Sequence, residues 1–324
     1  MDTTIAIVWN PSKTDRETLE KGLAKAIATR GKGIGKASSG EPEPEVTWWE
    51  TTVDDPGQGI AEKALATRPD LLIVAGGDGT VRAVAEHVAD AEADVALGIV
   101  PLGTGNLLAR NLDVPVGNVA NAFARALSEG DRSVDVGWVE VDLEGGKERH
   151  GFVVMIGFGI DAQMIAETDE DLKAKAGWLA YVESLGRALK ANEIVPFHIA
   201  KDDEPGRDEQ GHTLLIGNCG VLQGGFPVLP DADPSDGELD YLVLSAEGVG
   251  EWLGTLKTMV WDNGLKRLTG ARDEDATSEA VNLGRARRIS VSLPEPRGFQ
   301  IDGEGMGETT SFEVSIQPGA IRVR

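Results

Sequence analysis

The stretch LLIVAGGDGT, residues 71–80, decides the fold of this chain of 324 residues. Its first half, Leu71–Ala75, is a short apolar run without charge, typical of a strand that is buried on both faces of a parallel sheet. Three glycines, an aspartate and a threonine follow, and apolar residues then recur at helical spacing from Val81 to Val88. The stretch therefore predicts a buried strand, a tight glycine loop and a helix that begins near Thr80.

The segments around it repeat this alternation of short apolar strands and amphipathic helices. Strand-like runs occur at Ile5–Trp9, Val46–Glu50 and Val95–Val100, and helical patterns separate them. Strands that alternate with helices favour an open parallel α/β sheet. We therefore predict an α/β domain over residues 1–133, with ligands bound at the carboxyl ends of its strands.

Beyond Ser133 the pattern changes to closely spaced strand-like runs. These runs predict an antiparallel β domain over residues 134–317. Two helical stretches, roughly Asp171–Ala191 and Val249–Asp262, interrupt the strands, and the polar run Asp202–Gln210 is predicted as a surface loop. A chain of 324 residues exceeds the size at which a single hydrophobic core stops growing, which agrees with two domains.

Composition argues against several classes of protein. The formal net charge is −23, whereas a nucleic-acid-binding protein needs a basic footprint for the phosphate backbone. No apolar run approaches the roughly 20 residues of a membrane-spanning helix. The start, MDTTIAIVWN, lacks the basic and apolar regions of a secretion signal, and the single cysteine, Cys219, cannot form an internal disulfide. We therefore expect a cytoplasmic protein without a nucleic-acid partner.

Two glycine-rich loops follow successive buried strands and point to a nucleotide site. In the first, Gly76–Thr80, glycines let backbone amides approach an anion, and the following helix directs its positive end to the same place. Asp78 would repel phosphate alone, so its presence favours a Mg²⁺ ion beside the phosphates. The second loop, Pro101–Asn106, also follows a strand and opens a helix at Leu107–Asn111. Side by side, the two loops can bind the ribose and the phosphates of a nucleotide, although each loop alone can be an ordinary turn.

Several common catalytic motifs are missing from the sequence. It has no G-x-x-x-x-G-K-[ST] phosphate loop and no G-x-S-x-G nucleophile elbow. Its four histidines show no metal-binding spacing. These observations leave the two glycine loops as the candidate site.

Taken together, GGDGT at Gly76–Thr80 and PLGTGNLLAR at Pro101–Arg110 resemble the diacylglycerol kinase catalytic-domain family, which includes soluble bacterial lipid kinases and, more distantly, NAD kinases. The resemblance covers nearly the whole chain, through further motifs at Gly157–Asp161, Pro230–Asp240 and Ile301–Glu304. It implies an NAD-kinase-like open α/β domain, an antiparallel β-sandwich domain and an active site in the cleft between them. It also implies that a last strand, at about residues 318–324, returns to the first domain.

The resemblance further implies an ATP-dependent lipid kinase that transfers the γ-phosphate to a lipid hydroxyl, with diacylglycerol as the expected acceptor. The expected ATP contacts are Asn10, Thr51, Gly76, Gly77, Asp78, Gly79, Thr80, Val81, Arg82, Ala83, Gly103, Thr104 and Asn106. A structural Mg²⁺ is expected on the carboxylate of Asp236, with Asp233 and Glu238 assisting through backbone carbonyls. Glu304 is the expected general base, and Asp78 is expected to serve Mg²⁺ and ATP in catalysis.

Chemical reasoning supports part of this assignment. Phosphoryl transfer to an alcohol needs a base and charge neutralisation at the γ-phosphate. Asp302 and Glu304 lie on one glycine-containing turn, so either can face a cleft as the base. The aspartates of Asp231–Asp240 and their turn carbonyls suit a hard cation, and a solvated turn has the same composition.

Some alternatives stay open. Thr52 can replace Thr51 as the ATP contact, and Lys13 stands where many members of the family carry glycine. An NAD kinase shares the first glycine loop, but no Asn-Glu pair follows between Pro101 and Asp113 to grip a ribose. A catalytically silent regulator that binds a nucleotide or a lipid is the third alternative.

The expected lipid substrate makes the membrane surface the expected partner. An acidic chain reaches an anionic membrane only through a local basic or apolar patch. The candidate patch combines Arg285, Arg287 and Arg288 with Lys266 and Arg267, and scattered surface charges are the alternative. Peripheral membrane association and a homodimer are both compatible with the sequence, which does not name the lipid.

Overall fold

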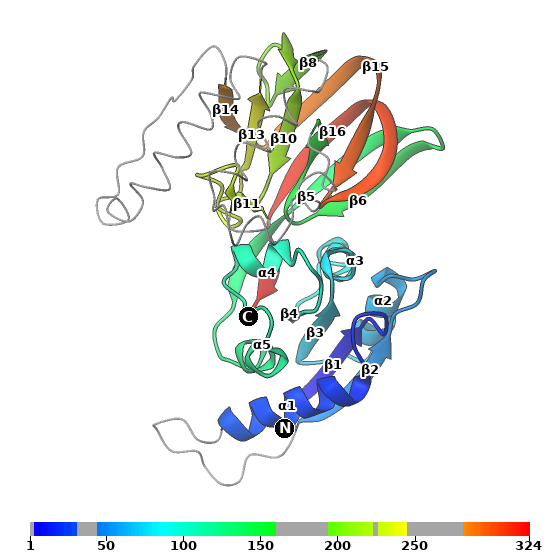
Figure 1. The fold of residues 1–324 in the computed structure, drawn as a ribbon, viewed down its shortest axis with the longest axis vertical. Helices are drawn as coiled ribbons and strands as arrows, with labels where there is room; N and C mark the ends of the chain where they lie inside the picture. The colour runs from blue at the N-terminus through cyan, green and yellow to red at the C-terminus, as the bar shows by residue number, and fades with distance from the viewer. Residues whose placement is uncertain (1–2, 31–43, 160–193, 223–225, 245–280) are drawn as a thin grey trace, which may run out of the picture.

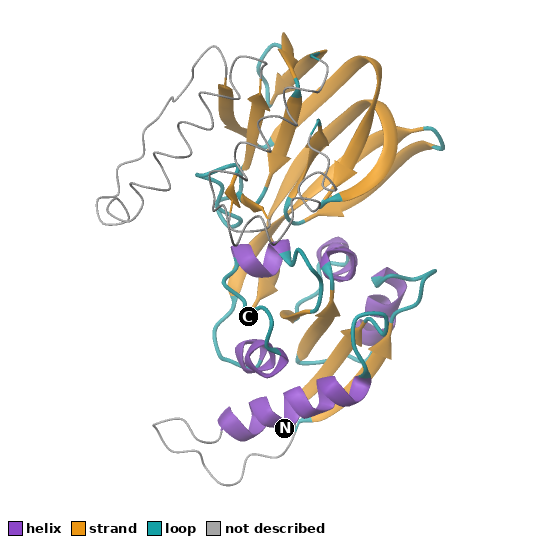
Figure 2. Ribbon diagram, viewed as in Figure 1, coloured by secondary structure: helices purple, strands orange, loops and turns teal. Residues whose placement is uncertain are grey.

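The structure is a computed structural model that describes residues 3–30, 44–159, 194–222, 226–244 and 281–324. The helical stretches expected at about Asp171–Ala191 and Val249–Asp262 lie outside these residues, as do Ile160, Asp161, Lys266 and Arg267. Within the described ranges, no helix is long and apolar enough to cross a membrane. Figures 1 and 2 show two halves stacked along the long axis, one a helix-covered sheet and the other rich in strands.

The first half is a parallel sheet with helices on both faces. Its elements are β1 (Thr4–Trp9), α1 (Arg16–Arg30), β2 (Glu45–Glu50), α2 (Gln58–Ala66), β3 (Leu71–Gly76), α3 (Asp78–Asp90), β4 (Ala96–Pro101), α4 (Leu107–Asn111) and α5 (Val119–Ala126). The strands pair in the order β2-β1-β3-β4, and every pair is parallel. Helices α1 and α5 pack together on one face, and α2 and α3 pack together on the other.

The alternation of side chains along a strand explains this arrangement. In β3, Leu72 and Val74 join the core beneath α2 and α3, whereas Leu71 and Ile73 join the core beneath α1 and α5. Every residue of β3 and β4 is buried, because helices cover both faces of the sheet. The predicted open parallel α/β sheet is confirmed, and so is the short helix at Leu107–Asn111.

The second half consists of antiparallel strands. They are β5 (Arg132–Leu143), β6 (Gly146–Phe152), β7 (Met155–Phe158), β8 (Val195–Lys201), β9 (Arg207–Gly211), β10 (Thr213–Gly217), β11 (Val221–Leu222), β12 (Phe226–Pro227), β13 (Leu239–Leu244), β14 (Val281–Ala286), β15 (Arg288–Ile301) and β16 (Glu304–Val323). All except the β11-β12 pair belong to a 14-stranded sheet that includes the four parallel strands. Buried rings fill the core of this half, with Phe158 edge-on to Phe197 at 5.6 Å. The expected antiparallel β region is confirmed.

One expected detail is wrong. The sequence predicts a surface loop over Asp202–Gln210, but β9 begins at Arg207 and pairs antiparallel with β8. Among the described residues this strand pairs only with β8, and most of its side chains are exposed. Water therefore surrounds its polar residues, so the apolar alternation that marks a half-buried strand is absent.

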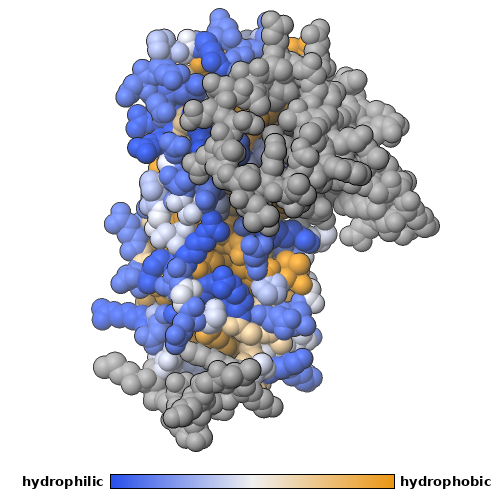
Figure 3. All heavy atoms as spheres, turned by 90° about the vertical axis from the view of Figure 1, so that its left-hand side faces the viewer, coloured by the Kyte–Doolittle hydropathy of each residue, from blue (hydrophilic) through white to orange (hydrophobic). Residues whose placement is uncertain are grey.

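Strand β16 joins the two halves. Over most of its length it pairs antiparallel with β5 and β15, and its residues Arg322 and Val323 pair in parallel with β4. The chain therefore ends beside β4, in the first half of the molecule (Figure 1). Figure 3 shows that one face of the described surface is largely hydrophilic, with apolar residues visible around the middle, where the halves meet.

Candidate active site

The loop after β3 forms one side of the candidate site. Strand β3 ends at Gly76, Gly77 is the N-cap residue of α3, and Asp78 is the first helical residue, so the helix starts earlier than the expected Thr80. Gly79 is exposed, and no atom of the described residues lies within 4 Å of the place where its side chain would begin. Because the first turn of a helix has amides without intrahelical acceptors, this loop presents donors to an anion.

The loop after β4 lies directly against the first loop. The Leu102 amide donates to the Gly76 carbonyl at 2.8 Å. A Cβ on Gly103 would lie 2.8 Å from the Cα of Gly77, so this close backbone approach requires glycine. Asn106, in the left-handed region at φ 49°, closes the second loop by accepting the Gly103 amide on its side-chain oxygen at 2.8 Å. The two loops therefore lie side by side, as the sequence predicts.

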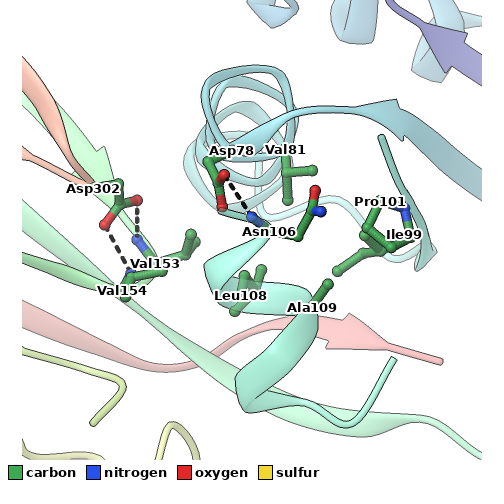
Figure 4. Close-up of a pocket in the computed structure, with 10 residues that line it drawn as sticks. All are labelled: Asp78, Val81, Ile99, Pro101, Asn106, Leu108, Ala109, Val153, Val154 and Asp302. Carbon is green, nitrogen blue, oxygen red and sulfur yellow. Dashed lines mark hydrogen bonds between the residues drawn. The ribbon is translucent and has the colours of Figure 1, made fainter. Parts of the chain in front are cut away.

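Asp78 connects the two loops. Its carboxylate accepts a hydrogen bond from the Asn106 amide at 2.8 Å (Figure 4) and another from the Leu107 amide at 2.5 Å, one on each oxygen. These amides open α4, so the aspartate caps that helix from the neighbouring loop. Nothing in the sequence pattern indicates this capping role, and the expected role of Asp78 with Mg²⁺ stays a prediction.

Polar residues at the ends of β1 and β2 extend the same edge. The side-chain amide of Asn10 donates to the Thr80 hydroxyl at 3.2 Å. Thr51 is buried, and its amide donates to the Trp9 carbonyl at 2.9 Å, whereas Thr52 is exposed. The carboxyl ends of all four parallel strands thus meet at one edge, which is where open α/β sheets bind ligands.

The remaining expected nucleotide contacts differ in exposure. Val81 and Ala83 are buried in α3, so their side chains belong to the core and only their backbone can serve ATP. Thr104 is exposed in the second loop. The side chain of Arg82 is only 12% exposed, and it pairs with a residue of the second half.

The turn between β15 and β16 reaches this region from the second half. Asp302 in this turn is buried, and its carboxylate accepts the amides of Val153 and Val154 (Figure 4) and of Met155, each at 2.9 Å. Burial raises the pKa of Asp302 to about 6, and the hydrogen bond from Val153 opposes the rise. Asp302 and Asp78 line one cavity of about 10 Å³, enough for about one water molecule. Asp302 therefore anchors the turn.

Glu304 is the first residue of β16. Its side chain is 61% exposed, and its Oε2 accepts a hydrogen bond from Nη2 of Arg82 at 2.5 Å. The carboxylate of Asp302 is enclosed by three amides, whereas that of Glu304 is open to a substrate. The geometry therefore favours Glu304 over Asp302 as the general base.

Two further carboxylates of α3 face the second half. Burial raises the pKa of Glu86, against the hydrogen bond from the Gly151 amide and the charge of Arg82. Asp90 accepts a hydrogen bond from Arg149 at 2.7 Å. Because Arg82, Glu86 and Asp90 are spaced by four residues, they share one face of the helix. This face of α3 is therefore a polar contact between the two halves.

Comparison with known proteins identifies the family. Residues 36–139 match the family described as diacylglycerol kinase catalytic domain, and residues 154–324 match the YegS C-terminal NAD kinase beta sandwich-like domain. A relative from Pseudomonas aeruginosa named "Probable lipid kinase YegS-like" is 32% identical over 283 residues, which cover 86% of this chain and 82% of the relative. A relative of the same name from Pseudomonas fluorescens is 35% identical over 273 residues, 82% of this chain and 81% of the relative. The chain belongs to the YegS-like lipid kinases.

The fold of this YegS-like lipid kinase agrees with that of a solved structure. A structure described as a diacylglycerol kinase from Bacillus anthracis superposes with a TM-score of 0.67 at 22% identity, covering 99% of this chain and 96% of the other. At this identity the likeness concerns the fold alone. The expected combination of an NAD-kinase-like α/β half with a β-sandwich half is confirmed.

The residues expected at a structural Mg²⁺ lie in the loop that precedes β13 of this YegS-like chain. Asp233 accepts hydrogen bonds from the Ser235 hydroxyl at 2.6 Å and from Arg132 at 2.8 Å, and these neighbours lower its pKa. The Asp233 carbonyl accepts the Asp236 amide at 3.3 Å, and Oδ1 of Asp236 accepts the Glu238 amide at 3.0 Å. In the part of the chain that the structure describes, no three His, Cys, Asp or Glu side chains are grouped to hold a metal ion. The Asp233 carboxylate is therefore occupied by Ser235 and Arg132, and a Mg²⁺ held by the Asp236 carboxylate with the carbonyls of Asp233 and Glu238 stays a prediction.

Asp135 is an important residue that the sequence analysis missed. It is 1% exposed in β5, and its carboxylate accepts the amides of Gly237 at 2.7 Å and Gly319 at 2.6 Å. It thus fastens the loop of residues 233–238 to the bend in β16. The signal was present in the sequence, because a single acid within an apolar strand must find partners when it is buried.

Proposed function

We propose that this YegS-like lipid kinase transfers the γ-phosphate of ATP to the hydroxyl of a diacylglycerol-like lipid. The observation that carries the proposal is the meeting of two features from opposite halves of the molecule. The paired glycine loops lie at the carboxyl edge of the parallel sheet, and the Glu304 carboxylate reaches α3 from β16. The first feature suits a nucleotide, and the second suits removal of a proton from an alcohol.

In the transfer step, the acceptor hydroxyl oxygen attacks the γ-phosphorus in line with the oxygen that bridges to the β-phosphate. A P–O bond forms to the lipid, the bond to the bridging oxygen breaks, and its electron pair leaves with ADP. The hydroxyl proton passes to Glu304 and from there to water. The amides around Gly77 and Gly79 and the positive end of α3 stabilise the charge on the phosphates.

We also propose that the nucleotide is used as its Mg²⁺ complex. The γ-phosphate needs charge neutralisation during transfer, and a divalent cation bound to the phosphates supplies it. Both oxygens of Asp78 accept amide hydrogen bonds. These bonds position the second loop at the phosphate site, and the expected role of Asp78 with Mg²⁺ is tested by Asp78→Asn.

The expected arginine patch gives little support to binding at a membrane surface. Arg285 pairs with Asp240 at 3.2 Å, and Arg288 lies 3.7 Å from Glu313. Neighbouring acids thus offset two of the arginines. Peripheral membrane association is tested by sedimentation with anionic vesicles, in which a triple change of Arg285, Arg287 and Arg288 to Glu should reduce binding. Unchanged sedimentation of that variant removes the patch from the proposal.

The direct test of the function is transfer of labelled γ-phosphate from ATP, with Mg²⁺, to a panel of acceptors. The panel contains diacylglycerol, monoacylglycerol, ceramide, sphingosine, phosphatidylglycerol and NAD. Label in diacylglycerol is the expected result, and label in another lipid corrects the substrate. Label in NAD supports the NAD kinase alternative instead. No label with ATP binding intact supports the silent regulator.

Replacement of Glu304 tests the assignment of the base. We expect Glu304→Gln to keep ATP binding and to lower turnover by roughly 10²- to 10⁴-fold, the usual contribution of a general base. Glu308→Gln is the matched control, because Glu308 is an exposed acid on the same strand. Wild-type turnover in Glu304→Gln would remove Glu304 from the mechanism.

A further inference from the structure

Helix α4 joins the second glycine loop to the second half of the molecule through one side chain. Its last residue is Asn111, and strand β11 lies against the helix (Figure 1). The side-chain amide of Asn111 donates to the Val221 carbonyl at 2.8 Å, and its side-chain oxygen accepts the Val221 amide at 3.0 Å. Asn111 therefore pairs with Val221 as the backbone of a neighbouring strand would, with one donor and one acceptor.

The other end of α4 is fixed at the nucleotide loops. The amides of Asn106 and Leu107, where the helix begins, donate to the Asp78 carboxylate at 2.8 and 2.5 Å. The side chain of Asn111 also donates to the Leu107 carbonyl at 2.9 Å, which ties the last residue of the helix to its first. Because a helix of five residues has little stability of its own, these contacts at its two ends determine where it lies.

The segment that precedes Val221 leads to the turn that carries the proposed base. The Cys219 amide donates to the Val154 carbonyl at 3.1 Å. The Val154 amide in turn donates to the carboxylate of Asp302 at 2.9 Å, and Asp302 lies two residues before Glu304. Cys219, Val154 and Asp302 are all buried, so water does not compete for these hydrogen bonds. A short series of hydrogen bonds thus connects β11 with the turn between β15 and β16.

We propose that Asn111 is a positioning residue that sets the distance between the second glycine loop and the general base. The inference rests on the proposed kinase function, in which the terminal phosphate and Glu304 must meet at one hydroxyl. Asp78 and Asp302, from the two halves, line the same small cavity, and Asn111 connects the segments that hold them (Figure 4). Asn111 acts through these segments and contacts neither substrate. Misplacement by about 1 Å far from the reacting atoms can lower turnover about 100-fold.

A purely structural role for Asn111 explains these contacts less well. The pair between Asp90 and Arg149 already joins the two halves, with side chains that are 60% and 49% exposed. Asp90 is the last residue of α3, about three helical turns from the first glycine loop, so that pair holds the halves together without acting on the loop. Packing alone requires only an apolar side chain at residue 111, whereas a donor and an acceptor on one side chain also fix the position of the partner strand.

The first test compares the turnover of Asn111→Ala with that of Asp90→Ala, a matched truncation at the other contact between the halves. We expect Asn111→Ala to lower kcat by about 10-fold or more and to change the KM for ATP by less than about twofold, because the nucleotide contacts stay in place. Asp90→Ala should keep the wild-type kcat. The midpoint of urea unfolding is measured for each variant, to show that it is folded.

Asn111→Gln provides a second variant in case the truncated protein does not fold. It keeps both polar groups and carries them one carbon farther from the backbone. The change therefore alters the position of β11 relative to α4 more than it alters stability. We expect kcat to fall in this variant as well, with a KM for ATP close to that of the wild type.

A further measurement does not depend on turnover. Hydrogen exchange followed by mass spectrometry reports the amides of residues 219–222 with and without ATP. In the wild type, ATP should slow their exchange by about 10-fold, because α4 connects them to the nucleotide loops. This protection should be lost in Asn111→Ala and kept in Asp90→Ala. Protection of residues 102–107 by ATP should remain in both variants, since it reports binding at the loop itself.

Each other outcome would overturn the proposal in its own way. A wild-type kcat in Asn111→Ala would remove Asn111 from the reaction, and an equal loss in Asp90→Ala would mean that any contact between the halves has the same effect. A loss that is just as large in a Glu304→Gln background would show that Asn111 does not act through the base. Should the wild type phosphorylate no lipid, the kinase proposal fails. The exchange measurement with ATP still decides the link, and unchanged protection of residues 219–222 in Asn111→Ala would refute it.

Discussion

The pH dependence of stability provides a direct check on Asp302. Burial raises the pKa of this carboxyl from 3.8 to about 6 in the folded protein. Between these values the native state binds more protons than the unfolded state, so the free energy of unfolding falls as the pH rises. A difference of about two pKa units corresponds to about 3 kcal/mol, present below the unfolded pKa and lost once the pH passes the folded pKa.

Asp302→Asn removes this titration and keeps the shape of the side chain. Between about pH 5 and pH 7.5, the variant should gain about 1.4 kcal/mol of stability relative to the wild type, which is the part of the total that falls in this window. The range begins above the isoelectric point of about 4.5, where the chain would lose its net charge and associate. Urea unfolding followed by tryptophan fluorescence gives both free energies at each pH.

Asp142→Asn is the control, because Asp142 is an exposed acid on β5. Asp240, whose pKa burial also raises to about 6, is present in both proteins and cancels in the comparison. A variant that loses stability relative to the wild type as the pH rises would refute the reasoning. That result would mean that the three amide hydrogen bonds outweigh burial and hold Asp302 ionised.

Three further changes test the contacts that build the site. Gly103→Ala forces its Cβ against the Cα of Gly77, so ATP affinity in calorimetry should fall by about 10-fold. Gly298→Ala is the control, because no atom of the described residues lies within 4 Å of its added Cβ. Equal ATP affinities of the two variants would contradict the close packing of the glycine loops. Asp135→Ala leaves two amides without their acceptor and should lower the free energy of unfolding, measured in urea, by about 2–4 kcal/mol. An unchanged midpoint of urea unfolding would rule out the fastening role of Asp135. Asp78→Asn should weaken ATP binding and cost about 1–2 kcal/mol through the cap on α4. An unchanged Mg²⁺ dependence of its turnover would refute a role of Asp78 at the metal. The loss of stability tests the capping role separately.

The parallel half of the fold was predictable because its signals are local. An uncharged run such as Leu71–Ala75, a glycine loop and a helical stripe of apolar residues follow one another directly along the chain. The contact between the glycine loops also follows from local rules, since successive parallel strands end at the same edge. The short helix at Leu107–Asn111 was placed correctly for the same reason.

The partners of the acidic residues were not predictable, because they come from distant parts of the chain. The amides that hold Asp302 precede it by 147 to 149 residues, and the amide of Asn106 follows Asp78 by 28. A carboxylate that binds backbone amides and one that binds a cation look alike in a sequence. Only the fold shows that Asp78 and Asp233 already have partners. Strand β9 was missed for a related reason, since its exposed residues lack the apolar pattern of a half-buried strand.

Strand β16 determines how the two parts of the reaction are brought together. It begins at the proposed base, Glu304, and near its end it pairs with β4, the strand that leads into the second glycine loop. Its bend at Gly319 is held by Asp135. The position of the base relative to the nucleotide loops is thus set by backbone pairing and a buried hydrogen bond. Because rotation of one half about a hinge would break the pairing of β16 with β4, the fold favours a preformed site.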